Sequence, residues 1–361
     1  MPTTLPFDRT HIQPGDRLCV ALSGGADSVA LLLTLHAANA AKHHALGVGL
    51  SAVHVHHGIR DEEADADQRF AEDLCIRLEV PLHLHQASVP QRAAANKETL
   101  EEAARAIRYD FFHTLIASGH ADTILTAHTL DDQAETVLMK LLRGAWTEGL
   151  SAIHPVVLIN NDKPGNRPGK ILRPFLHTRR ADIEAFLRAQ NQPWREDSTN
   201  ADTAYTRNRI RHQLLPQLRD YNPNLAHILA NLAELAREEE SRWQAELART
   251  LPQLLLPGKP VRGGGRAVST APGETSIAIE LDRLRALDPA LRRRVIRAAA
   301  RQLGARLSFD ETARLLALCG FQPYPPVGSP TVAARTGATL QLAHNLRAER
   351  SPRELRLFLS P

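Results

Sequence analysis

The stretch Ser23-Gly24-Gly25-Ala26-Asp27-Ser28 decides how the rest of this chain is interpreted. It follows an apolar run at residues 18–22 and precedes another at residues 29–35, so a buried strand is predicted to turn into a helix here. The two glycines allow a sharp turn and a close approach to a ligand, and the first amides of the helix face that ligand. The sequence therefore predicts an anion-binding loop that suits a phosphate.

Neither of the two commonest phosphate loops, G-x-x-x-x-G-K-[ST] and G-x-G-x-x-G, explains this hexapeptide. It resembles the PP-loop, Ser-Gly-Gly-x-Asp-Ser, of ATP pyrophosphatases, which cleave ATP to AMP and pyrophosphate while they adenylate a carbonyl oxygen. On the residues alone, an ordinary glycine-containing turn with Asp27 or Ser28 in the first helical turn is the alternative.

Length and composition favour a cytoplasmic protein of two domains. The 361 residues suffice for two domains with room for a third small one. Lys and Arg number 44 against 40 for Asp and Glu, so the chain is only mildly basic and the location of the charge decides its meaning. We expect neither a signal peptide nor a membrane span, because no suitable apolar segment occurs. The oligomeric state is left open, with a homodimer among the alternatives.

Strand and helix patterns alternate through the first half of the chain. The predicted strands cover residues 18–22, 46–56, 81–85 and 123–127, and the predicted helices follow the loop and cover residues 61–79, 98–118 and 131–143. Repeated βα units with right-handed crossovers build a doubly wound, mainly parallel sheet, which is the predicted α/β fold class. Ligands bind such sheets at the carboxyl ends of the strands.

Two further polar clusters fall at predicted strand ends. One is His54-Val55-His56-His57-Gly58-Ile59-Arg60, and the other, residues 126–136, has Asp132 and Glu135 three apart at a helix start. Two carboxylates on one helix face suit Mg²⁺ or an ammonium group, whereas ordinary capping with Thr129 as the N-cap is the other interpretation. The histidines are interpreted as neighbours of a nucleotide, and solvated histidines are the alternative. A metal site is disfavoured there because no cysteine stands nearby.

Arginines add positive charge near these clusters. Arg105 follows Glu101 by four residues, so the pair could be a surface bridge on a helix. Arg207, Arg209 and Arg211 stand beside an aromatic residue and suit phosphate binding, although arginine-rich helices are often merely solvated.

Taken together, these segments resemble the tRNA(Ile)-lysidine synthetase family. In the family's order, the matching pieces are residues 23–28, 54–60, 101–109 and 126–136, Leu141-Leu142-Arg143-Gly144, Arg173-Pro174-Phe175-Leu176, and residues 194–211. The chain departs from the family pattern at Thr129, where a second histidine or an amide residue is usual, and at Trp146, where a glycine is common. The family's contacts for residues 144–149 are therefore not carried over.

The resemblance implies an ATP-dependent ligase with Mg²⁺ that acts on tRNA(Ile) with a CAU anticodon. ATP adenylates the C2 carbonyl oxygen of the wobble cytidine, and free L-lysine then attacks C2 and expels AMP, which forms lysidine. The residues expected at ATP are Ser23, Gly24, Gly25, Ala26, Asp27, Ser28, His54 and His57. The expected catalytic residues are Asp27, Asp132, Glu135, Arg105 and Arg207: Asp27 and Asp132 as metal contacts, Asp132 and Glu135 for Mg²⁺ or the lysine ammonium, Arg105 and Arg207 for phosphate or the lysine carboxylate.

The second half of the chain reads as a mainly helical domain. Helices are predicted at residues 222–250, 288–303 and 309–318, so the expected division is a catalytic domain at 1–220, a tRNA-binding domain at 221–327 and a short C-terminal segment at 328–361. Arg293, Arg297 and Arg301 recur every four residues and share a helix face. We interpret them as a stripe that contacts the tRNA backbone, with a solvated face as the alternative.

Two other functions stay open from the sequence. A PP-loop tRNA thiolase would need reactive cysteines or an iron-sulfur site, and Cys19, Cys75 and Cys319 are far apart, without a Cys-x-x-Cys pair. They are predicted to be buried thiols. An ATP-regulated RNA-binding module without chemistry would bind tightly and release no AMP.

Overall fold

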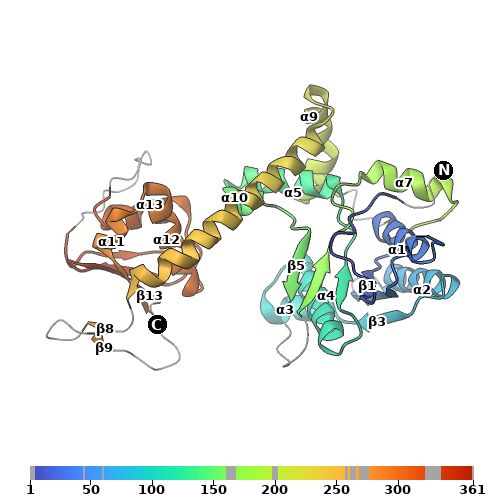
Figure 1. Cartoon of the computed structure of the whole chain (residues 1–361), viewed down its shortest axis with the longest axis horizontal. Helices are drawn as coiled ribbons and strands as arrows, with labels where there is room; N and C mark the ends of the chain where they lie inside the picture. Colours follow the sequence, from blue (N-terminus) through green and yellow to red (C-terminus); the bar gives the residue numbers. More distant parts are fainter. Residues whose placement is uncertain are drawn as a thin grey trace. The chain divides into compact units, whose positions relative to one another are not determined.

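The computed structural model describes residues 5–43, 45–58, 61–159, 168–196, 202–256, 259–260, 266–267, 276–321 and 335–359. The chain divides into two compact units, Met1–Glu238 and Glu239–Pro361, and Figure 1 follows it from blue to red. This division falls later in the chain than the predicted boundary at residues 220 and 221. The functional division of the chain stays a prediction.

A six-stranded sheet forms the centre of the first unit, in the order β3-β2-β1-β4-β6-β5. Its strands are β1 (Arg17–Ala21), β2 (Gly49–His56), β3 (Leu82–Gln86), β4 (Thr123–Leu125), β5 (Val156–Ile159) and β6 (Gly169–Leu172). Neighbouring strands are parallel except β5 and β6, which are antiparallel. The predicted α/β class with a mainly parallel sheet is confirmed. The strand order reverses at β1 and β4, so a ligand crevice is expected at their carboxyl ends.

Helices cover both faces of this sheet, as Figure 1 shows. The helices of this part of the chain are α1 (Ala26–Asn39), α2 (Asp61–Arg77), α3 (Val89–Asn96), α4 (Leu100–Ala117), α5 (Leu130–Leu142), α6 (Thr147–Leu150) and α7 (Arg180–Ala189), of which α1, α2 and α7 pack on one face and α4 on the other. Side chains alternate along β1, so Leu18 and Val20 pack in one core with α1, α2 and α7. Cys19 faces the other core, with Phe112 of α4. Both faces of β1 are thus buried, which explains its continuous apolar sequence.

After α7 the chain forms α8 (Thr206–Arg209), a π-helical turn η2 (Ile210–Leu214), α9 (Leu215–Tyr221) and α10 (Leu225–Leu254). Ile210 and the first turns of α10, through Leu229 and Ala233, pack against Val137 of α5 in a separate apolar cluster. This packing holds the arginine-rich segment against the helix that carries Asp132.

The second unit combines helices with an antiparallel sheet. Its helices are α11 (Leu281–Ala286), α12 (Pro289–Gln302) and α13 (Phe309–Leu318), and its five-stranded sheet has the order β11-β12-β13-β10-β7. The strands are β7 (Leu255–Leu256), β10 (Ser276–Glu280), β11 (Thr339–Gln341), β12 (Leu346–Arg350) and β13 (Glu354–Leu359), while β8 (Lys259–Pro260) and β9 (Arg266–Ala267) pair separately. The helices at 288–303 and 309–318 were predicted, whereas the strands were not. Much of the predicted C-terminal segment 328–361 therefore belongs to this sheet.

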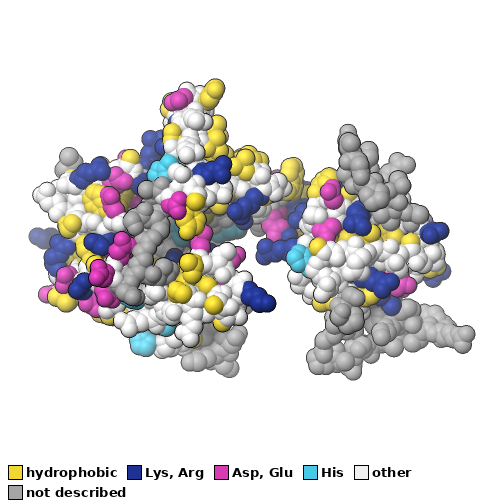
Figure 2. Space-filling view, turned by 180° about the vertical axis from the view of Figure 1, so that it is seen from behind, with side chains coloured by type: hydrophobic (Ala, Val, Ile, Leu, Met, Phe, Trp, Pro, Cys, Tyr) yellow, Lys and Arg dark blue, Asp and Glu magenta, His cyan; other side chains and the backbone are white. Residues whose placement is uncertain are grey.

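The arginines of α12 pack partly on aromatic rings. The guanidinium of Arg293 lies 4.8 Å from the ring centroid of Phe309, and that of Arg292 lies 4.5 Å from the ring of Phe321. On the face drawn in Figure 2, basic and acidic side chains are interspersed over the described residues of both units. Among the described residues, no helix is both long and apolar enough to cross a membrane.

Candidate functional site

The predicted phosphate loop joins the end of β1 to the start of α1. Gly24 has a φ of +88°, and an added Cβ would lie 3.3 Å from the side chain of Arg195, so the position favours glycine twice over. Gly25 is the N-cap of α1 and, as a glycine, offers no side-chain acceptor to the first amides of the helix. Ser28 donates a hydrogen bond to the carbonyl oxygen of Gly25 at 3.0 Å and lies 3.1 Å from the hydroxyl of Ser23. The loop is thus built as expected for an anion site at a helix N-terminus.

The histidines at the end of β2 lie beside this loop. The Nδ1 of His54 is 2.8 Å from the carbonyl oxygen of Leu22, and burial lowers the pKa of this ring. Burial and then the charge of Arg108 lower the pKa of His57 to about 4. The Nδ1 of His57 is buried without a hydrogen-bond partner among the described residues. Both rings are therefore neutral at pH 7, while Ile59 and Arg60 of the predicted segment lie outside the described residues.

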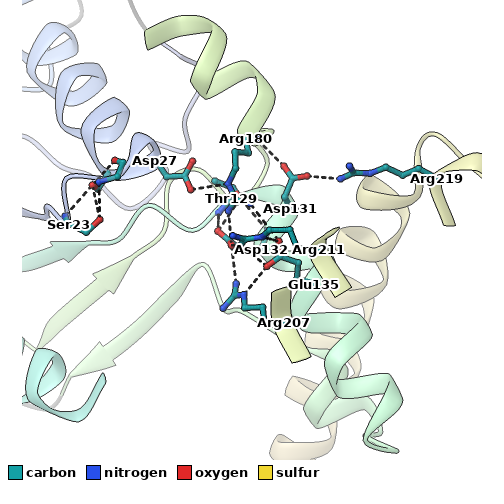
Figure 3. Close-up of polar contacts among 12 residues, drawn as sticks. Ser23, Asp27, Thr129, Asp131, Asp132, Glu135, Arg180, Arg207, Arg211 and Arg219 are labelled. Atoms are coloured by element: carbon teal, nitrogen blue, oxygen red, sulfur yellow. Dashed lines mark hydrogen bonds and ion pairs between the residues drawn. The ribbon is translucent and has the colours of Figure 1, made fainter. Parts of the chain in front are cut away.

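Three carboxylates and three arginines meet at the carboxyl ends of β1 and β4 and form what we call the ion-pair cluster (Figure 3). Its members are Asp27, Asp132, Glu135, Arg180, Arg207 and Arg211. They come from four separate parts of the chain: α1, α5, α7 and the α8 and η2 segment. The cluster is therefore a product of the tertiary fold.

Arg180, at the start of α7, contacts all three carboxylates. Its Nε lies 3.3 Å from Oδ2 of Asp27, and its Nη2 lies 3.0 Å from Oδ1 of Asp132. Its Nη1 lies 3.6 Å from Oε1 of Glu135. This guanidinium is therefore the link between the phosphate loop and α5.

Arg207 and Arg211 hold the carboxylates of α5. Arg207 donates from Nε to Glu135 at 2.8 Å and from Nη2 to Asp132 at 3.0 Å. Arg211 donates to the two oxygens of Glu135 at 2.6 and 2.9 Å, and its Nη2 also lies 3.3 Å from Asp132. The side chain of Glu135 is only 1% exposed, so its charge depends on these arginines for compensation.

The two aspartates of the cluster differ in their ionisation. Burial raises the pKa of Asp27 to about 6, and the nearby Arg180 offsets this only in part. Burial alone would also raise the pKa of Asp132, but Arg180 and Arg207 hold it well below its usual range. Asp132 is thus firmly ionised, whereas Asp27 lacks full compensation for its charge.

The donor set fits a divalent cation at Asp27 better than at Asp132. The Oδ1 of Asp27 is buried and has no hydrogen-bond partner among the described residues, so it is open to a cation. The Oδ1 of Asp132 contacts three arginines, and its Oδ2 accepts bonds from the amide and hydroxyl of Thr129 at 2.9 and 3.0 Å. Within the described ranges no group of three or more His, Cys, Asp or Glu is placed to hold a metal. A Mg²⁺ ion here would need oxygen ligands from a nucleotide as well.

Both residues that depart from the family pattern are helix N-caps. Thr129 is the N-cap of α5 and forms a capping box with Asp132, so the capping interpretation is confirmed, while the other carboxylate oxygen of Asp132 faces the arginines. Trp146 is the N-cap of the short helix α6, and its side chain is 72% exposed. An added Cβ on Gly149 would come 2.5 Å from that of Ala145, so this turn is tightly packed beside an exposed tryptophan.

Arg105 lies on α4, separately from the ion-pair cluster. Its guanidinium is 4.7 Å from the ring centroid of Tyr109 and donates to the hydroxyl of that tyrosine at 3.0 Å. The same hydroxyl accepts a bond from the buried Arg173 at 3.3 Å. Burial, followed by the charges of Arg173, Arg207 and Arg105, lowers the pKa of His128 to about 4. Arg105 and Arg207 therefore both lower the pKa of His128, from two different helices.

Sequence reasoning missed Arg180 and Arg219. Arg219 binds Asp131 at 2.8 Å, and the amide of Arg180 donates to the other oxygen of Asp131 at 2.8 Å. The sequence signal that could have found Arg180 is its place in the first turn of a helix, where the helix dipole disfavours a basic residue. A basic residue there predicts an acidic partner nearby. Residues 197–201 of the matching segment lie outside the described residues.

Comparison with known proteins agrees with this geometry. Residues 6–218 match the family described as the PP-loop domain, and residues 280–351 match the TilS substrate binding domain. A PP-loop domain implies the use of ATP. A solved structure, the U34-tRNA thiolase NcsA from Methanococcus maripaludis with its [4Fe-4S] cluster, has a TM-score of 0.52 and 15% identity over 64% of this chain and 76% of that one. This likeness concerns the fold alone.

Curated relatives described as tRNA(Ile)-lysidine synthase align over most of this chain. Those of Solibacter usitatus and Geobacter sulfurreducens are each 39% identical, over 79% and 84% of this chain. The chain spans only 56% and 60% of their lengths. The relative of Nitratidesulfovibrio vulgaris is also 39% identical, over 83% of this chain and 82% of its own length. With both family domains matched and the PP-loop built as described, the chain belongs to the tRNA(Ile)-lysidine synthase family.

Proposed function

We propose that this protein is an AMP-forming ligase that joins free L-lysine to C2 of the wobble cytidine in tRNA(Ile) with a CAU anticodon, which yields lysidine. The observation that carries the proposal is the junction between the PP-loop and two buried carboxylates of α5, made through Arg180. If the loop binds the phosphates and the two carboxylates bind the lysine ammonium, the two ligands would lie side by side. Such a pairing suits a reaction that activates one substrate with ATP and then admits an amine.

The chain's own groups divide this chemistry between them. ATP supplies the adenylyl group that turns the cytidine oxygen into a leaving group, and Mg²⁺ would offset charge on the phosphates. The amides at residues 24–28 would bind those phosphates, and Oδ1 of Asp27 is open to the cation. Asp132 and Glu135 would bind and orient the lysine ammonium, and Arg207 would face the phosphate or the lysine carboxylate. His128, held neutral by its surroundings, can donate or accept a hydrogen bond without adding charge.

The cysteines support this function over sulfur transfer. Burial raises the pKa of Cys19 to about 12, that of Cys75 to about 11 and that of Cys319 to about 12. A reactive cysteine needs a lowered pKa and access to solvent, and all three thiols are buried.

The test is AMP release from ATP in the presence of total bacterial tRNA, with and without L-lysine. Labelled lysine should enter the tRNA, and AMP release should depend on both tRNA and lysine. A parallel search for a thiolated base separates a thiolase. Tight tRNA binding with no AMP release would leave a binding module without chemistry, and the proposal would be wrong.

We also propose that the second unit binds the tRNA and that the reaction takes place in the cytoplasm, where tRNA, ATP and lysine occur together. The match to a substrate binding domain supports the first part. Changing Arg293, Arg297 and Arg301 together to Gln should weaken tRNA binding and reduce its salt dependence, since each phosphate contact contributes about 0.7 to 0.9 to the slope of log K against log salt. An unchanged slope would mean that these arginines contact only protein and solvent.

A further inference from the structure

Arg180 lies between the phosphate loop and the two carboxylates of α5. Its guanidinium lies 3.3, 3.0 and 3.6 Å from the carboxylates of Asp27, Asp132 and Glu135, which belong to the nucleotide side and the amine side of the proposed reaction. Their side chains are 23%, 10% and 1% exposed, so little water is present to screen an added charge. In the ion-pair cluster three positive charges already balance three negative ones. A further cation at Asp132 and Glu135, whose oxygens are already bound by the arginines and Thr129, requires one arginine to withdraw.

Among the three arginines, Arg180 makes the longest contact with Glu135, although its 3.0 Å contact with Asp132 is as short as that of Arg207. Arg207 and Arg211 bind Glu135 at 2.8 and 2.6 Å, whereas Arg180 lies 3.6 Å from the same carboxylate. Arg180 is also the first residue of α7, where the helix dipole disfavours a cation. Its backbone amide is anchored to Asp131 at 2.8 Å, so the side chain can move while the helix stays in place.

We propose that Arg180 is a positioning residue that couples the two halves of the site, by holding the carboxylates of Asp27, Asp132 and Glu135 together until ligands replace its guanidinium. The lysine ammonium takes its place on Asp132 and Glu135, and the same movement frees Oδ2 of Asp27 for the cation that accompanies the nucleotide. This inference rests on the function proposed above and adds a residue and a coupling to it.

The coupling follows because both ligands displace the same group. Whichever ligand binds first bears the free energy of moving Arg180, and the second then binds to a site that is already open. Lysine and nucleotide should therefore strengthen each other's binding. By reciprocity, the factor is the same whichever ligand is measured.

The experiment measures L-lysine binding to the full chain by calorimetry, with and without Mg²⁺ and α,β-methylene ATP, whose bridging methylene resists cleavage. In the parent chain, the nucleotide should lower the lysine dissociation constant on the order of fivefold or more. In Arg180→Met, the ratio of the lysine dissociation constants without and with nucleotide should fall to about one, because no guanidinium has to be displaced. Lysine alone should bind Arg180→Met more tightly than it binds the parent, which a purely structural role for Arg180 would not produce.

Arg188→Met is the matched control, since Arg188 lies on the same helix and forms an exposed pair with Glu184. It should keep the parent ratio. If Arg180→Met does not fold, Arg180→Lys serves instead, because a single ammonium cannot span three carboxylates as the guanidinium does, and the ratio should again be reduced.

The inference would be overturned by a ratio in the Arg180 variants equal to that of the parent, or by weaker binding of lysine alone to Arg180→Met. A parent chain that binds lysine without any effect of the nucleotide would overturn it as well. In these cases lysine-dependent AMP release by the parent would leave the proposed function intact. A parent that binds no lysine would overturn both.

Discussion

Removing the carboxylate of Glu135 should destabilise the first unit strongly. In Glu135→Ala, Arg207 and Arg211 lose the group that accepts three of their hydrogen bonds, at 2.6 to 2.9 Å. Breaking a buried ion pair from one side costs about 3 to 5 kcal/mol, because the remaining charge is left without compensation. The two arginine side chains are 36% and 21% exposed and can recover some hydration, so we expect the lower end, about 3 kcal/mol.

Thermal and urea unfolding of the full chain would measure this loss. For a unit of this size, a loss of about 3 kcal/mol corresponds to a fall in Tm of about 6 to 12 °C in the transition of the first unit. Glu184→Ala on α7 is the control, because its partner Arg188 is 64% exposed and the loss should stay below about 0.5 kcal/mol. If Glu135→Ala loses less than about 1 kcal/mol, the arginines are adequately hydrated without their partner, and the electrostatic account of the cluster is wrong.

Three further predictions concern activity, the thiols and pH. Asp27→Ala should abolish AMP formation and leave tRNA binding in place, because Asp27 belongs to the phosphate loop. A variant that loses tRNA binding but still turns over ATP would contradict this. A chain with Cys19, Cys75 and Cys319 all changed to Ala or Ser should keep lysine-dependent AMP release, and the incorporation of labelled lysine into tRNA would measure this activity. Each substitution should lower the free energy of unfolding by about 1 kcal/mol. A folded variant that cannot modify tRNA would refute the prediction. The pKa of His128 is about 4 in the folded protein and about 6.5 in the unfolded chain, so the unfolded chain takes up this proton first as the pH falls. The free energy of unfolding is therefore retained in full above pH 6.5 and decreases as the pH falls toward 4. Between pH 7 and pH 5, the free energy of unfolding measured in urea should decrease by about 1 to 2 kcal/mol less in His128→Gln than in the parent. Equal decreases in the two chains would contradict the lowered pKa of His128.

Much of the fold could be predicted because its signals are local. Apolar spacing placed α4 and α5 to within a few residues, and a continuous apolar run indicated a strand buried on both faces, as β1 is. The strands of the second unit were missed although β12 alternates buried and exposed residues. Three of its five residues are charged, so the alternation of apolar and polar residues extends over only two apolar positions and did not predict a strand.

The sequence by itself also determined the chemical content of the site: a loop with free amides, and two carboxylates three residues apart on one helix face. Only the tertiary structure decided which charges meet. Arg180 is 153 residues from Asp27 and 48 from Asp132, so no spacing rule along one helix or strand could connect them. The contact exists because parallel strands bring their carboxyl ends to one edge of the sheet, where the start of α7 reaches the loop after β1. Local patterns depend on neighbours within a turn or a strand pair, whereas the balance of buried charge depends on groups that only the folded chain brings within a few ångströms of one another.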